Sequence, residues 1–398
     1  MPQTGPLSAL SDDQTGRGDR PANGTATTVE NPPQSTVAPE TAPPRPAADG
    51  PEPRAAATLT VTDGPTPAAT AAEAPVSPAT PTEDPAPPSP VTERPAPHAH
   101  TVVTKELAHR TTETDVFPAR WTRISDNRFR FTAHWPAAHP FFGPVDDRHQ
   151  DPMIVGETLR QASMVLAHAE FGAPADTHFV MWDLTVRVDP SALLLADAAE
   201  PVEFDVVCSE VRRRGSGLHS MRTTMEFRRA GRLVADGTGS TGCTSPRAYR
   251  RLRADRLNAL DTPVPLLPGI APRTAGRARA EDVVLAPTDR PGVWHLRVDT
   301  GHPVLFPRPN DHVPGMVLFE AARQAATAAS GLRPFLPATM TAGFTRYAEL
   351  HTPCRIEAEV CDESPGEVTV RVSGRQDGGS VFTAALTAAR PPRVRSLP

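Results

Sequence analysis

The sequence predicts an α+β fold made of two copies of one domain, preceded by a long N-terminal tail. Three observations support this prediction. Proline is concentrated in the first hundred residues, the rest of the chain contains a gapless internal repeat, and each copy of the repeat has an apolar helical segment followed by strand-like segments. One buried helix against an antiparallel sheet is a common α+β arrangement.

The first hundred residues contain almost nothing from which a core is built. Positions 1–100 have no Phe, Trp, Tyr or Ile, yet they hold nearly half of the chain's 48 prolines. Such a segment buries too little apolar surface to offset the backbone entropy lost on folding, roughly 1–2 kcal/mol per residue. We expect a disordered tail rich in Pro, Ala and Thr over residues 1–100. Its proline-rich runs also resemble ligands of SH3-like domains, but a tail or linker is the preferred interpretation.

Composition also limits the class of protein. Residues 1–20 lack the apolar region of a secretory signal, and no apolar run approaches the ~20 residues that span a bilayer. The four cysteines form no Cys-x-x-Cys pair, and the net charge is −5. Neither feature supports a disulfide framework or a nucleic-acid partner. We therefore expect a cytoplasmic protein with reduced thiols that uses no metal or other cofactor and binds no nucleic acid or membrane.

The chain after the tail contains an internal duplication. When residues 139–162 are aligned without gaps on residues 302–325, nine of 24 positions are identical, against about one or two expected by chance. The offset of 163 residues is far longer than a solenoid repeat, so it marks a duplicated domain. The identical pairs are His139/His302, Pro140/Pro303, Pro144/Pro307, His149/His312, Met153/Met316, Glu157/Glu320, Arg160/Arg323, Gln161/Gln324 and Ala162/Ala325.

Each copy contains one strongly apolar segment bounded by residues that start and end helices. We predict helices over Met153–Phe171, after a proline and before Gly172, and over Gly315–Ser330, between Pro314 and Gly331. A helix that is apolar nearly all round is buried on most of its circumference. The predicted strands are 129–134, 178–188, 202–212, 218–227 and 232–243 in the first copy, and 294–298, 340–350, 355–361, 367–372 and 381–388 in the second.

These elements set the expected domain boundaries. The first repeat is predicted over residues 105–258, a proline-rich linker over 259–280, and the second repeat over 281–392. Just before the linker, Pro246–Leu257 is predicted to be a short helix with five arginines. Its arginines indicate either a solvated face or a docking patch for an acidic partner.

Each apolar helix carries a glutamate and an arginine three residues apart. Glu157 and Arg160 in the first copy, and Glu320 and Arg323 in the second, therefore share one helix face. Each ion in a buried helix loses several kcal/mol of hydration. Repetition of the pair at the same place thus favours a functional polar pocket over an ordinary surface ion pair. A buried carboxylate with a raised pKa suits a general base, and a guanidinium suits an anionic group of a substrate.

The second helix resembles the central helix of hot-dog enzymes. Residues 314–324 (PGMVLFEAARQ) are similar to the motif PG-V-L-x-x-E-A-x-x-Q of β-hydroxyacyl-carrier-protein dehydratases. The resemblance implies a double hot-dog fold, in which a curved antiparallel sheet wraps a central helix in each copy. Gly143 and Phe306 stand where those enzymes carry a catalytic histidine, which argues against dehydration. His149 and His312, eight residues before the glutamates, either take over that role or brace the start of the helix.

A closer resemblance covers nearly all of the chain from about residue 105 to 392. Several separate motifs in the right order resemble the A-factor biosynthesis (AfsA-like) family: HR at 109–110, DPM at 151–153 with RQA at 160–162, AHAEFG at 167–172, FVMWD at 179–183 and CTSP at 243–246. The resemblance implies transfer of a β-ketoacyl group from acyl carrier protein to dihydroxyacetone phosphate. The product would lead to γ-butyrolactone-type signals that control antibiotic production in actinobacteria.

The same resemblance implies roles for individual residues. The expected catalytic residues are Glu157, Glu320 and Arg323. The expected substrate-binding residues are Arg160, Gln161, Gln324, His149 and His312. The two copies would form an intrachain pseudo-dimer, with or without a further homodimer.

Two other functions remain open from the sequence. One is a hot-dog thioesterase, in which water replaces the phosphorylated acceptor, and the other is a non-catalytic regulator that binds acyl ligands. Residues 237–242 (GTGSTG) match GxGxxG, but they continue as a strand rather than opening a helix, which argues against a dinucleotide site. Motifs of serine hydrolases, P-loop NTPases and zincins do not occur in the sequence. Acyl transfer, which the family resemblance implies, is the preferred function.

Overall fold

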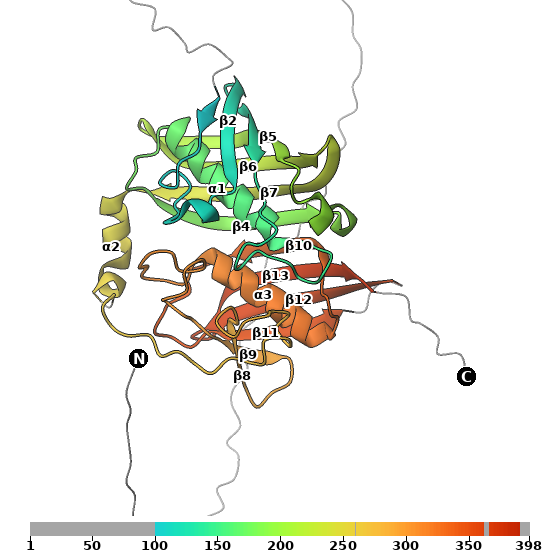
Figure 1. Cartoon of the computed structure of the whole chain (residues 1–398). Coiled ribbons are helices and arrows are strands. Elements are labelled where there is room, and N and C mark those ends of the chain that lie inside the picture. Colours follow the sequence, from blue (N-terminus) through green and yellow to red (C-terminus); the bar gives the residue numbers. More distant parts are fainter. Residues whose placement is uncertain (1–99, 259, 362–365, 391–398) are drawn as a thin grey trace, which may run out of the picture. The chain divides into compact units, whose positions relative to one another are not determined.

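The computed structural model describes residues 100–258, 260–361 and 366–390. The predicted tail therefore lies, apart from residue 100, outside the described residues. Within them, one antiparallel sheet has the strand order β1-β2-β3-β5-β6-β7-β4-β10-β13-β12-β11-β9-β8. Two long helices, α1 in the first repeat and α3 in the second, pack against it (Figure 1). The predicted α+β class with two copies of one domain is confirmed.

Both apolar segments form the predicted helices. α1 spans Met153–Ala169 and α3 spans Gly315–Ser330. Gly331, with a left-handed φ of 68°, ends α3 and donates its backbone N–H to the carbonyl of Thr327, a conformation that glycine adopts without strain. Almost every side chain of the two helices is buried, as their apolar composition requires.

The strands of the first repeat are β1 (Thr101–Val102), β2 (Pro118–Ser125), β3 (Arg128–Ala133), β4 (His178–Val188), β5 (Val202–Arg214), β6 (Gly217–Arg229) and β7 (Arg232–Thr244). Those of the second are β8 (Leu285–Pro287), β9 (Val293–Leu296), β10 (Pro337–Phe344), β11 (Arg355–Cys361), β12 (Glu367–Gln376) and β13 (Gly379–Ala389). Short 3-10 turns cover Glu113–Asp115, Pro190–Ala192 and Leu195–Asp197. Each predicted strand corresponds to an observed one.

The bounds of β10 depart most from the prediction. β10 was expected over residues 340–350, but it ends at Phe344. Beyond that point the chain turns away from the sheet, and the carbonyl of Ala348 accepts a hydrogen bond from Val313, next to the start of α3. β1, β2 and β8 were missed because two of them have only two or three residues and β2 lacks a regular alternation of buried and exposed side chains.

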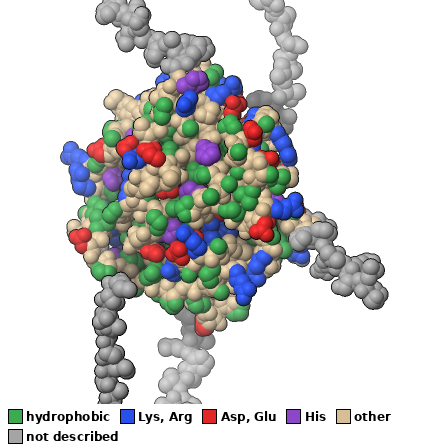
Figure 2. All heavy atoms as spheres, in the orientation of Figure 1, with side chains coloured by type: hydrophobic (Ala, Val, Ile, Leu, Met, Phe, Trp, Pro, Cys, Tyr) green, Lys and Arg blue, Asp and Glu red, His purple; other side chains and the backbone are tan. Residues whose placement is uncertain are grey.

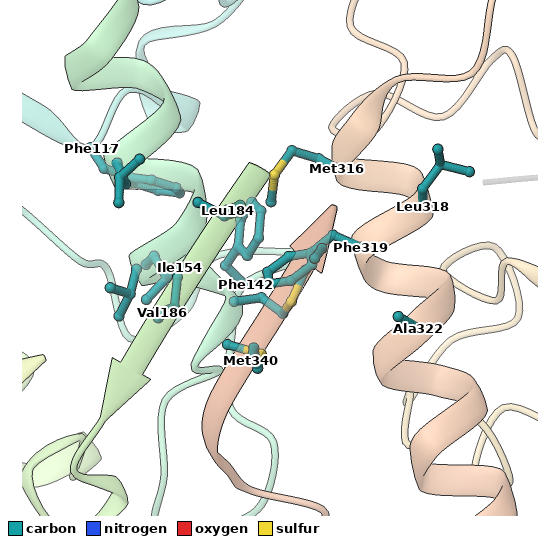
Figure 3. Packing of buried hydrophobic residues seen from close by; sticks show 14 of the residues in the cluster. Phe117, Phe142, Ile154, Leu184, Val186, Met316, Leu318, Phe319, Ala322 and Met340 are labelled. Carbon is teal, nitrogen blue, oxygen red and sulfur yellow. The ribbon is translucent and has the colours of Figure 1, made fainter. Parts of the chain in front are cut away.

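The two repeats are joined through the sheet. β4 of the first pairs with β10 of the second in antiparallel register, from Arg187 opposite Thr339 to Asp183 opposite Gly343. Beneath this junction, Phe319 of α3 points toward Leu184 of β4 (Figure 3). These residues belong to a hydrophobic core that contains buried side chains of both repeats.

A glycine in α1 makes room for this core. A Cβ atom at Gly156 would lie 3.3 Å from Cε1 of Phe319 and 3.4 Å from Cδ2 of Leu184, both of which are buried. Gly156 and Phe319 occupy equivalent positions in the repeat, each directly before the helix glutamate. The small residue in one copy therefore complements the large residue in the other.

Helix α2 (Pro246–Leu257) forms as predicted and packs on the second repeat. Ser245 caps it by accepting from the backbone N–H of Ala248. Arg253 is buried and donates to both Asp311 (2.7 Å) and Glu349 (2.6 Å). One of the five arginines is therefore structural, whereas the other four are exposed.

The surface carries charges of both signs. On the face shown in Figure 2, acidic and basic side chains are interspersed rather than gathered by sign. No helix among the described residues is both long enough and apolar enough to cross a bilayer.

We expect Gly156→Val to lower the free energy of unfolding by about 1–3 kcal/mol, because the added carbons overpack the core beside Phe319. The matched control is Gly217→Val, where the nearest atom to a new Cβ is 3.8 Å away. Urea unfolding of both variants measures the effect. Equal stability of the two variants would show that the core adapts to the larger side chain.

Candidate active site

The predicted glutamate of the first repeat lies at the centre of a buried cluster. Glu157 is fully buried, and its Oε1 accepts from Gln161 Nε2 (2.7 Å) and Arg160 Nη2 (2.7 Å), while its Oε2 accepts from Arg160 Nε (3.0 Å). Arg110, which precedes the 3-10 turn at residues 113–115, donates from its Nε to Oε1 at 3.1 Å. The structure thus brings together three predicted site residues and adds an arginine.

The second repeat builds the same cluster. Glu320, also fully buried, accepts from Arg323 Nε (2.9 Å) and Nη2 (2.7 Å) and from Gln324 Nε2 (2.6 Å). Arg277 donates its Nε to Oε1 at 2.8 Å. Each glutamate is therefore held by two arginines and one glutamine, and we refer to the two clusters as the Glu157 site and the Glu320 site.

The two glutamines connect each cluster to a neighbouring backbone segment. Gln161 Nε2 also donates to the carbonyl of Asp115, and its Oε1 accepts from the N–H of Phe117. Gln324 makes the same pair of bonds with Asp282 and Val284. Both glutamines fix the segments that carry Arg110 and Arg277, and their predicted role in substrate binding stays a prediction.

The two additional arginines were not predicted, although the sequence contains a signal for them. Arg110 stands five residues before Asp115, and Arg277 stands five residues before Asp282. These pairs repeat at an offset of 167 rather than 163, so an alignment without gaps from the helices does not reach them. Arg277 also falls within the predicted linker over residues 259–280, where prolines dominate the composition.

Each site is completed by the other repeat. Arg110 donates its Nη1 to the carbonyl of Val304 (2.7 Å), and Arg277 donates its Nη1 to the carbonyl of Phe141 (2.8 Å). Val304 and Phe141 are equivalent positions at the offset of 163. Neither site therefore keeps these contacts if the repeats separate.

The expected raised pKa of the glutamates is wrong. Burial alone would raise the pKa of Glu157, but the charges and hydrogen bonds of Arg110 and Arg160 outweigh it and lower this pKa to about 2. Arg277 and Arg323 likewise lower the pKa of Glu320 to about 2 against the effect of burial. Both carboxylates are ionised at neutral pH, and both oxygens of each accept hydrogen bonds from an arginine side chain. They hold the arginines in place.

The histidines predicted to bind substrate lie in the loops before the helices. His149 Nδ1 contacts the carboxylate of Asp146 at 3.0 Å, and His312 Nδ1 contacts that of Asp311 at 2.9 Å. His312 also contacts Tyr249 of α2 through its Nδ1 and the ring of Tyr347 through its own ring. These contacts match the interpretation that they brace the start of the helix, and a role in substrate binding stays a prediction.

The two sites differ in charge. At the Glu320 site, Asp151 of the first repeat accepts from Arg277 at 3.0 Å, whereas Pro314 holds the equivalent position of the second repeat. The Glu157 site has instead an additional cation nearby, Arg308, whose equivalent in the first repeat is Val145. The Glu157 site therefore carries a surplus of positive charge, which suits an anionic substrate group.

The sites also differ in access. The Arg160 side chain keeps 22% of its surface exposed, against 2% for Arg323. Beside the Glu320 site lies a cavity of about 380 Å³, lined by residues that include Phe141, Arg277 and Arg323. Of the two arginines on the helices, Arg160 is thus the one that reaches solvent directly.

Other candidate groups are part of the scaffold. The four cysteines are free and buried, and burial raises the pKa of Cys208 and Cys354 to about 12, so these thiols stay protonated. The glycine-rich segment at 237–242 lies within β7 rather than at the start of a helix. No group of three or more metal-ligating side chains occurs among the described residues.

Comparison with known proteins identifies the family. The family model for the A-factor biosynthesis hotdog domain matches residues 91–245 and 260–390. The chain belongs to this family. The two matched segments confirm the predicted double hot-dog fold, and each reaches into a region that the sequence assigned to the tail or the linker.

Curated relatives cover nearly the same part of the chain. A 2-oxo-3-(phosphooxy)propyl 3-oxoalkanoate synthase of Streptomyces virginiae is 46% identical over 72% of this chain and 97% of its own length. Synthases of the same name from Streptomyces coelicolor and Streptomyces griseus are 45% and 43% identical, over 91% and 95% of their lengths. The similarity covers more than nine-tenths of each relative and 72% of this chain.

We expect Glu320→Gln to remove the contribution of residue 320 to the pH dependence of the free energy of unfolding. The folded-state pKa of Glu320 lies below its ordinary value of 4.5, so its ionised form stabilises the fold above about pH 4.5, and this contribution is lost as the pH falls toward 2. At pH 7 the variant should be less stable by about 3 kcal/mol or more, since two buried arginines lose their counter-charge.

Urea unfolding at pH 7, 4 and 3 measures this difference, which should shrink as the pH falls. The control is Glu226→Gln, whose exposed ion pair with Arg228 contributes little. A stability difference that stays constant with pH would contradict an ionised Glu320 in the folded state.

Proposed function

We propose that this chain is an acyltransferase that forms a 2-oxo-3-(phosphooxy)propyl 3-oxoalkanoate. It moves a 3-oxoacyl group from the thioester of an acyl carrier protein to the free hydroxyl of dihydroxyacetone phosphate. The single observation that carries the proposal is the 43–46% identity to synthases of this product over more than nine-tenths of their length. The product is the precursor of a γ-butyrolactone-type signal.

The chemistry required by this reaction suits the Glu157 site. The acceptor hydroxyl loses its proton as its oxygen attacks the thioester carbonyl, and the C–S bond then breaks. The phosphate at the other end of the acceptor needs a cation, and Arg160 is partly exposed and rigidly held by two hydrogen bonds to Glu157. We assign the phosphate to Arg160, and to Glu157 the role of orienting it.

The remaining partner and location follow from this reaction. Acyl carrier protein and dihydroxyacetone phosphate are both cytoplasmic, so we place the enzyme in the cytoplasm. The two fused repeats supply each other's site contacts within one chain. The reaction therefore requires no further homodimer.

Incubation of the full chain with a 3-oxoacyl carrier-protein thioester, with and without dihydroxyacetone phosphate, tests the function by mass spectrometry. We expect a phosphorylated ester only when both substrates are present. Free 3-oxo acid at equal rates in both tubes would instead indicate a thioesterase. Unchanged thioester in both tubes would indicate a binding protein.

Arg160→Gln should raise the KM for dihydroxyacetone phosphate by roughly ten- to a hundredfold, as expected for the loss of a hydrogen bond to a charged group. The KM for the acyl donor should change little. Arg187→Gln is the matched control, because Arg187 is an exposed arginine paired with Asp236 on the sheet. If the KM for the phosphorylated acceptor is unchanged in Arg160→Gln, a cation other than Arg160 binds the phosphate.

A further inference from the structure

Two histidines of the first repeat form a chain of hydrogen bonds beside the Glu157 site. His109 precedes Arg110 in the sequence, and its Nε2 lies 2.8 Å from Nε2 of His168, on α1. His168 Nδ1 lies 2.8 Å from the carbonyl oxygen of Ala173, and His109 Nδ1 lies 2.8 Å from Nη2 of Arg308. Neither histidine belongs to the predicted site residues.

The end groups of this chain determine both tautomers. The carbonyl of Ala173 only accepts, so His168 carries its proton on Nδ1 and its Nε2 is an acceptor. Arg308 only donates, so His109 Nδ1 accepts and its Nε2 carries the proton. Both rings are neutral in this arrangement. Burial, followed by the charges of Arg308 and Arg160, lowers the pKa of His109 to about 3, in agreement with a neutral ring.

The backbone of His109 adopts a conformation that glycine tolerates best. Its φ is 55°, in the left-handed region that disfavours residues with a Cβ. At the offset of 167 that relates Arg110 to Arg277, the second repeat has Gly276 with φ 68°. The fold therefore requires this conformation in both copies and uses glycine in one. The first repeat has a histidine at this position, at a cost in backbone strain. Strain of this kind is found at functional sites.

The second repeat has no counterpart of the chain of hydrogen bonds. Gly331 stands at the position of His168, and Val145 at that of Arg308. Arg308 is partly exposed to solvent, and no carboxylate of the described residues lies within ion-pair distance of it. Its pKa is lowered by partial burial and by the charges of Arg160 and Arg110. An anionic ligand would therefore relieve the repulsion among these three cations.

We propose that His109 is the general base of the acyl transfer and that the Glu157 site, not the Glu320 site, carries out this step. This inference rests on the proposed function. The phosphate of the acceptor binds Arg160 and Arg308, which draws the Arg308 guanidinium away from His109 and leaves Nδ1 with a free lone pair. The acceptor hydroxyl then lies within reach of a neutral imidazole.

The proposed step balances. His109 Nδ1 takes the hydroxyl proton as the acceptor oxygen forms a C–O bond with the thioester carbonyl carbon. The C–S bond breaks, and the departing thiolate of the carrier protein receives that proton from the imidazolium. His168 is a positioning residue, because its Nε2 accepts from the ring of His109 and fixes the tautomer.

The test is His109→Gly, which copies the residue of the second repeat and removes the backbone strain. We expect kcat for ester formation to fall at least about a hundredfold, the usual contribution of a general base, with an unchanged or raised midpoint of thermal unfolding. Added imidazole should restore part of the rate, because the glycine leaves room for it. The control is His219→Ala, at an exposed histidine on β6, with wild-type kcat.

Two further variants separate the roles. His168→Leu should lower kcat about tenfold or more with an unchanged KM for dihydroxyacetone phosphate, whereas Arg308→Gln should raise that KM. A well-folded His109→Gly with wild-type kcat overturns the proposal, and so does a loss that imidazole does not restore. Wild-type protein that forms no ester from both substrates would instead defeat the proposed function itself.

Discussion

The ion cluster around each buried glutamate is the interaction on which the rest of the structure depends. A carboxylate without exposed surface is tolerated only because two arginines and a glutamine surround it. The glutamine ties the cluster to the segment before the helix, and one arginine ties it to the other repeat. Helix, loop and second repeat are therefore held in place by the same charge.

This arrangement also leaves Glu157 poorly suited to act as the base of the proposed reaction. Ionic partners that make burial of Glu157 tolerable also stabilise its charged form and depress its pKa. A general base must be unprotonated near neutral pH and must aim a lone pair at the substrate. Both oxygens of Glu157 already accept from an arginine side chain, whereas the Nδ1 lone pair of His109 becomes free once the proposed phosphate draws Arg308 away. The same phosphate offsets the charges of Arg308 and Arg160 that lower the pKa of His109.

Local signals predicted the helices, and the sequence as a whole predicted three of the four side chains of each cluster. Proline and glycine at the boundaries and nearly uniform apolarity were sufficient for α1 and α3, the spacing of three residues placed Glu157 and Arg160 on one face, and the family resemblance added Gln161. Arg110 and Arg277 were missed because tertiary folding, not helical periodicity, brings them to the glutamates. The sign of the pKa shift was wrong for the same reason, since burial was weighed without the second arginine.

The pairing of different residues at equivalent positions has a consequence for how such a protein arises. A homodimer of identical chains obeys twofold symmetry, so every residue appears at both of its sites. Here Gly156 packs against Phe319, and His109 is matched by Gly276. Duplication allows one copy to change while the other does not, and so it supplied an asymmetry that a homodimer of identical chains excludes.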